Sequence, residues 1–151
     1  MNANPLIPRY TIELVREGSV KIEDYASLSS SATAADIFKK LSDPKDRELF
    51  MVATLDSKNK IIGVNVVHIG GLVASYVHPR ETLKMAIQQN AAAIIIGHNH
   101  PSAVTNPSQE DRDVTRRISE ACKILGIRFL DSIIVSPESK EYFSFADVGQ
   151  T

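Results

Sequence analysis

Residues 91–111 read AAAIIIGHNHPSAVTNPSQED, and this stretch decides the predicted fold. It begins with an apolar run, 91–96, that is too short to cross a membrane and is rich in isoleucine. Such a run predicts a strand buried on both faces of a sheet. The run stops at Gly97 and polar residues follow at once. Because open α/β sheets place their ligands beyond the ends of such strands, we expect the functional site here.

Two histidines and an aspartate behind the strand form a candidate metal site. His98 and His100 are two residues apart, so on an extended segment their side chains project to the same side. Ser108 is a suitable N-cap for a following helix, whose first turn would carry Asp111 back over the strand end. Two histidines and one aspartate, with the fourth position left to water, suit an open zinc site. A His-x-His pair alone more often lies in a polar loop, but the ordered combination with S-x-x-D favours metal binding.

These motifs resemble those of a known family. HNHPS followed by PSQED resembles the JAMM metal motif of JAB/MPN domains, which has the form H-x-H-P, a spacer and S-x-x-D. The segments at 77–81, 90–102, 115–121 and 125–135 resemble the bacterial RadC-type branch of that family. The resemblance extends over residues 46–149 and therefore covers most of the chain.

The resemblance implies roles for particular residues. It implies that His98, His100 and Asp111 bind zinc, and that Ser108 supports the bound water or the developing oxyanion. It also implies a zinc-dependent hydrolase acting on a peptide or isopeptide bond of an unidentified peptide or protein, with a possible link to bacterial DNA repair. The implied architecture is the deaminase-like, three-layer mixed sheet of JAB/MPN domains.

The sequence departs from the family pattern at the position of the catalytic base. Many JAMM enzymes carry a glutamate on an earlier strand, and the matching residue here is Asn65. An amide cannot accept a proton as a carboxylate does. Glu81, His68 or a group of the substrate would then have to supply the base, or Asn65 would only position water. The alternative function is a zinc-binding interaction module that performs no chemistry. The helix-hairpin-helix segment of the family has no match in the first fifty residues.

The order of predicted elements indicates an α/β fold with a mixed sheet and helices on both faces. Residues 1–45 are predicted to form an N-terminal extension, made of a hairpin and a helix, that packs on a JAB/MPN domain at 46–151. The hairpin comes from the alternation of Tyr10, Ile12 and Leu14 over residues 9–23.

Further elements follow from apolar periodicity and from turn and capping residues. The helix of the N-terminal extension is expected to be capped by Thr33 and to end near Asp43-Pro44. The remaining predicted strands are 48–55, 61–69, 127–135 and 142–145, and the remaining helices run from Pro79 to Asn90 and from Ser108 to Leu125.

Composition excludes several classes of function. The net charge of −1 gives weak support for a nucleic-acid partner, and a metal-dependent nuclease is accordingly the weaker idea. The single cysteine, Cys122, is predicted to lie in the core and fits a reducing cytoplasm. We see neither a signal peptide nor an apolar stretch long enough for a membrane helix. A zinc deaminase would need H-x-E and P-C-x-x-C, which are absent. An edge strand at 142–145 could support a homodimer.

Overall fold

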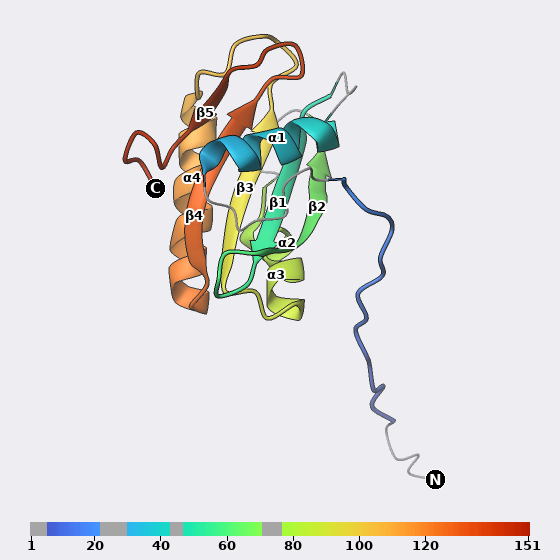
Figure 1. Ribbon diagram of the computed structural model, residues 1–151. Helices are drawn as coiled ribbons and strands as arrows, with labels where there is room; N and C mark the ends of the chain where they lie inside the picture. Colours follow the sequence, from blue (N-terminus) through green and yellow to red (C-terminus); the bar gives the residue numbers. More distant parts are fainter. Residues whose placement is uncertain (1–5, 22–29, 43–46, 71–76) are drawn as a thin grey trace.

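The computed structural model describes residues 6–21, 30–42, 47–70 and 77–151, and these form a sheet flanked by helices on both faces (Figure 1). The sheet has five strands in the order β2-β1-β3-β4-β5. Their bounds are β1 Leu49–Leu55, β2 Ile61–Ile69, β3 Ala93–Asn99, β4 Arg128–Val135 and β5 Tyr142–Ser144. β3 and β4 pair in parallel, whereas the other neighbouring strands pair antiparallel. The predicted three-layer mixed α/β fold is therefore confirmed.

β3 is the central strand and is buried along its whole length, as its sequence predicted. It does not stop at Gly97, however, but continues through His98 and Asn99. Glycine is needed here for space rather than for a turn, because a Cβ on Gly97 would lie 2.6 Å from Cε2 of Phe38. The aromatic ring packs directly on the strand backbone at this point.

One face of the sheet is covered by α1, Ser31–Ser42 (Figure 1). Its buried side chains, Ile37 and Phe38 among them, pack against alternate residues of β1, β3 and β4. This helix begins two residues before the predicted cap Thr33. The side chain of Ser30 instead accepts a hydrogen bond from the Thr33 N–H at 3.4 Å, which corrects the prediction.

The other face is covered by α2, Pro79–Thr82, α3, Lys84–Gln88, and α4, Gln109–Leu125. The predicted helix from Pro79 to Asn90 is thus interrupted at Leu83. Asn90 ends this segment with a positive φ of 51°, as a stop residue should. The second core cluster lies on this face and joins α4 and the α2–α3 segment to Phe50, Ile94 and Ile96 of the sheet.

α4 has the predicted caps at both ends. Ser108 is its N-cap and Gly126, with φ of 70°, is its C-cap. Val114, Ile118 and Cys122 form the buried stripe that periodicity predicted. Leu125 was also expected to be buried, but it is 49% exposed because it lies at the end of the helix beyond the edge of the core.

The predicted N-terminal hairpin is absent from the described residues. Residues 6–21 contain no strand, and Tyr10 is 82% exposed. Two isolated strands are marginal in water without further strands or a helix to pack on, and alternation alone does not supply that support. The end of the predicted hairpin, residues 22–23, lies outside the described residues.

Within the described residues, the helices lack the combination of length and apolar character that crossing a bilayer requires.

Candidate metal centre

The side chains of His98, His100 and Asp111 meet where β3 ends and α4 begins. The Nε2 atoms of the two histidines are 3.1 Å apart. Oδ1 of Asp111 lies 3.0 Å from Nε2 of His98, and Oδ2 lies 3.4 Å from Nε2 of His100. Among the described residues, this is the group of histidine, cysteine and acidic side chains whose geometry suits a metal ion. The sequence prediction that these three residues come together is confirmed.

The spacing of these atoms fits one shared metal ion. Ligands at about 2.0–2.1 Å from a tetrahedral zinc ion lie roughly 3.3 Å from one another. The separation of the two Nε2 atoms, 3.1 Å, and that of His98 Nε2 from Asp111 Oδ1, 3.0 Å, are close to that value, and one ligand atom from each of the three residues lies within 4.8 Å of the others. The arrangement therefore suits a small tetrahedral ion and provides three of its four ligands.

The three side chains are largely buried, and that of His100 is the most exposed of them. The side chains of His98 and Asp111 are each 4% exposed, whereas that of His100 is 17% exposed. A fourth ligand would reach the centre past His100. Three protein ligands with an accessible fourth position are the pattern of catalytic metal sites, since structural zinc sites are usually closed by a fourth protein ligand.

The loop after β3 fixes the tautomer of His100. Its Nδ1 lies 2.9 Å from the carbonyl oxygen of Val104, which can only accept a hydrogen bond. Nδ1 must therefore carry the proton, and in the neutral ring Nε2 is left with a lone pair that points into the site. A histidine that ligates a metal is commonly held by such a bond from its other nitrogen.

The first turn of α4 fixes Asp111. The Asp111 N–H donates to Oγ of Ser108 at 3.1 Å, and the Ser108 N–H donates to Oδ2 of Asp111 at 2.7 Å. This reciprocal pair is a capping box in which aspartate takes the place of the usual glutamate. The carboxylate of Asp111 thus caps the N-terminus of α4 and also faces the histidines. The start of α4 therefore determines where this metal ligand lies.

Asn99 holds the strand end from the opposite face, which sequence reasoning missed. It is fully buried, its Oδ1 accepts from the Leu49 N–H at 2.7 Å, and its Nδ2 donates to the Arg47 carbonyl at 3.0 Å. The carboxamide therefore joins the start of β1 to the segment between the two histidines. The alternation of side chains along the strand could have indicated this role for Asn99. If His98 and His100 point to one side of the sheet, the residue between them must point to the other side.

The charges in the site support one another. Burial raises the pKa of Asp111, but the hydrogen bonds from His100 and His98 outweigh it and hold the pKa well below the usual range. The hydrogen bond with Asp111 raises the pKa of His100, with burial opposing the shift. Asp111 is therefore ionised at neutral pH and available as an anionic metal ligand.

The remaining predicted site residues lie on separate elements. Ser108 acts as the helix cap described above. Glu81 lies on α2, about half exposed, with one carboxylate oxygen 2.7 Å from Nζ of Lys84. That hydrogen bond lowers the pKa of Glu81. The catalytic roles assigned to Ser108 and Glu81 stay predictions.

Asn65 lies on β2 and faces the same layer as the metal ligands. It pairs with Val52 of β1, which pairs with Ile96, two residues before His98. Strand spacing places Asn65 roughly 10 Å from Ile96, across β1. Its side-chain oxygen is buried and has no hydrogen-bond partner within the described part of the structure. Unpaired buried carbonyl oxygens are unusual, so this atom has capacity for a donor from water or from a bound molecule.

The other two histidines lie outside the group. His68 pairs with Phe50, which pairs with His98, so the buried Phe50 residue separates the two histidine positions across the sheet. His78 precedes α2, and its carbonyl oxygen accepts from the N–H groups of Glu81 and Thr82, each at 3.0 Å. The turn into the helix predicted for His78 is thus made by its backbone.

Comparisons with known proteins agree with this geometry. A family model described as the RadC-like JAB domain matches residues 28–150. A UPF0758 protein of Desulfitobacterium hafniense is 47% identical over 104 residues, which cover 69% of this chain and 45% of the relative. UPF0758 proteins of Thiobacillus denitrificans and Trichlorobacter lovleyi are each 42% identical, covering 82% and 85% of this chain and 54% and 55% of the relatives. The chain spans about half the length of these curated relatives.

Proposed function

Because the chain belongs to the RadC-like JAB domain family, we propose that it is a zinc-dependent hydrolase that cleaves a peptide or isopeptide bond. The observation that carries the proposal is the convergence of His98, His100 and Asp111 on one point with spacings of 3.0–3.4 Å. An ionised carboxylate and two imidazoles are ligands that zinc accepts well. Bound zinc supplies a Lewis acid that polarises a carbonyl group and makes water acidic near neutral pH.

The chain's own residues would orient the reaction. The bond from Nδ1 of His100 to the Val104 carbonyl keeps Nε2 directed at the metal position. Ser108 accepts from the Asp111 N–H through its oxygen and keeps its own hydroxyl proton. That proton is the donor that an oxyanion developing beside the centre would need. His100 is the most exposed of the three metal-binding residues, so a substrate carbonyl would approach the centre past its ring.

The test combines metal content with hydrolysis. Elemental analysis of the purified chain should find about one zinc per chain, and the His98→Ala variant should lack it. The zinc-loaded protein should hydrolyse members of a peptide and isopeptide library, and His100→Ala should not. His78→Ala is the matched control, because this histidine lies outside the group, and it should retain activity. Equal background cleavage by the wild type and by His100→Ala would refute the hydrolase.

The second candidate is a module that binds zinc and interacts with a partner without chemistry. Asn65 favours it, because its amide cannot take the proton that the family's glutamate would accept. Glu81 is the described carboxylate proposed as a substitute, but its pairing with Lys84 favours the ionised form and weakens it as a base at neutral pH. If Asn65→Glu gains hydrolysis that the natural chain lacks, the interaction module is the correct function.

The biological setting is part of the proposal. A peptide or protein substrate fits the chemistry of the site better than a nucleic acid does, because the net charge of −1 gives little attraction for phosphate. The family name supports a link to DNA repair. A cytoplasmic location is supported by the single cysteine, Cys122, which is buried and unpaired.

A further inference from the structure

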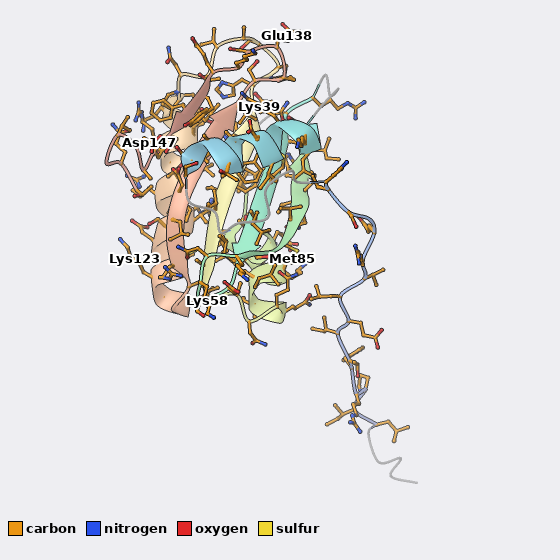
Figure 2. All side chains as sticks on the ribbon, in the orientation of Figure 1. Lys39, Lys58, Met85, Lys123, Glu138 and Asp147 are labelled. Atoms are coloured by element: carbon orange, nitrogen blue, oxygen red, sulfur yellow. The ribbon has the colours of Figure 1, made fainter. Side chains whose placement is uncertain are left out.

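The N-terminal segment at residues 9–15 has the pattern of a strand but lacks a sheet. It reads RYTIELV, in which Tyr10, Ile12 and Leu14 alternate with polar residues. These three side chains are 82%, 75% and 52% exposed. Figure 1 shows the segment, in blue, leading away from the folded body, and Figure 2 shows its side chains in open space. Period-two apolar spacing fits a strand with one buried face, so we call residues 9–15 the arm.

Among the described residues, the sheet has an open edge at β2, and this strand is similar in length to the arm. β2 is the first strand in the sheet order, and it pairs with β1 on its other side. Val64 and Val66 pair with Ala53 and Met51, so both project toward the α1 face. Val66 is 37% exposed, and Val64 is partly buried against the core on that face. An open edge strand with apolar side chains is a template for another strand.

The arm is held apart from its own β2. The carbonyl oxygen of Lys21, six residues after the arm, accepts a hydrogen bond from Nζ of Lys40 at 3.3 Å. This bond connects the chain after the arm to the last turn of α1. The side chain of Arg16 then bonds to Gly18 and Ser19 in a local turn. Beyond that turn the arm points outward (Figure 1). In the described structure its apolar face therefore lies away from its own sheet and is exposed.

We propose that the arm of each chain adds as a strand to the β2 edge of a second copy, forming a symmetric dimer. Each chain has one arm and one long edge strand, β2, whereas the other edge strand, β5, has only three residues. A two-fold axis therefore satisfies both arms and both β2 edges with identical contacts. Main-chain hydrogen bonds provide the attachment, and the side chains of Tyr10, Ile12 and Leu14 lie against Val64 and Val66. A seven-residue arm is long enough to pair with most of the nine-residue β2.

The first test is the mass of the full chain in solution by sedimentation equilibrium, from about 1 to 100 µM, a range that brackets micromolar affinities. A dimer is expected. Ile12→Asp removes one buried apolar side chain per arm and should weaken the dimer at least about tenfold. Thr11→Asp changes the neighbouring residue on the polar face of the arm and should leave the dimer intact. A chain that stays monomeric throughout this range overturns the proposal.

The receiving edge is tested in the same way. Val66→Asp should weaken the dimer, whereas Ile124→Asp, at a side chain 86% exposed on α4, should not. Circular dichroism melting of each variant establishes that it is folded. If Val66→Asp and Ile124→Asp have the same effect, the β2 edge is not the docking site.

A crosslinking experiment distinguishes exchange between copies from folding of the arm onto its own chain. One copy carries only Ile12→Cys and a differently tagged copy carries only Val66→Cys, so a disulfide between these positions must join two chains. Cys122 is buried and burial raises the pKa of its thiol to about 11, so it should not compete. A disulfide between the two tagged copies supports the exchange. A disulfide confined to a single chain carrying both cysteines would show that the arm docks on its own β2 and would overturn it.

Discussion

Replacing Asn99 with alanine tests whether the residue between the two histidines holds the metal centre in place. Its carboxamide makes two hydrogen bonds to the backbone of Leu49 and Arg47, and its side chain is fully buried. Each bond contributes about 1 kcal/mol net, and the Leu49 N–H left without a partner costs about 1–3 kcal/mol more. The expected loss in free energy of unfolding is therefore about 3–5 kcal/mol.

Urea denaturation of the metal-free protein measures this loss. At an m-value of about 2 kcal/mol/M in urea, the midpoint should fall by about 1.5–2.5 M. Asn106→Ala is the matched control, because Asn106 is an exposed asparagine in the loop between His100 and Ser108. Its free energy of unfolding should stay within about 0.5 kcal/mol of the wild type.

The same variant should bind metal more weakly, because Asn99 fixes the strand end from which both histidines project. A loss of about tenfold in zinc affinity is expected, which is the lower end of the usual effect of removing a group that orients metal ligands. Competition with a chromogenic chelator, under conditions where the variant is folded, measures it. If Asn99→Ala unfolds at the same urea concentration as Asn106→Ala, or binds zinc as tightly as the wild type, the bracing role assigned to Asn99 is wrong.

Three further predictions concern the same end of the sheet. Gly97→Ala forces a Cβ against the ring of Phe38 and should lower the free energy of unfolding, measured in urea, by about 1–3 kcal/mol. Adding Phe38→Leu should recover part of this loss. If the losses of the two single variants simply add in the double variant, the proposed contact is contradicted. Ser108→Ala removes the helix cap and should cost about 1 kcal/mol, whereas Ser108→Gly should cost only a few tenths, so equal losses would argue against capping. In the presence of a chelator, the melting temperature should fall as the pH rises through the raised pKa of His100. The pair of protonated His100 with Asp111 stabilises the fold fully below the pKa of the unfolded chain, about 6.5, and this contribution is lost above the pKa of the folded protein. His100→Gln should remove the decline in melting temperature, and a decline that persists in this variant would refute the assignment.

The central strand, the long helix and the metal ligands could be predicted because their signals are local. An unbroken apolar run predicts a buried strand, and Ser108 and Gly126 mark the ends of α4 by ordinary capping chemistry. Once β3 and α4 are predicted correctly, the approach of Asp111 to His98 and His100 follows. The alternation of side chains along β3 and the first turn of α4 leave these three side chains few other directions.

The parts that could not be predicted depend on contacts between distant segments. Nothing near Gly97 in sequence indicates the ring of Phe38, which approaches from α1. The bonds of Asn99 reach back about fifty residues to the start of β1. The alternation of Tyr10, Ile12 and Leu14 predicted a hairpin, but a strand also needs a neighbour, and among the described residues the arm has none. The pattern of the arm is consistent with a partner outside the chain.

Asn65 bears on the choice between the two functions, but its chemistry and its surroundings lead to different expectations. As an amide it cannot act as the base, which favours the interaction module. Yet its buried oxygen has no partner within the described residues, and leaving such a group unpaired costs about 1–3 kcal/mol. A residue kept only for packing would avoid that cost, for example as leucine, whereas a residue that accepts a hydrogen bond from water or a substrate N–H recovers it on binding. Within the described residues, the oxygen of Asn65 therefore has capacity for a hydrogen bond from water or from a bound molecule, whichever of the two functions the chain performs.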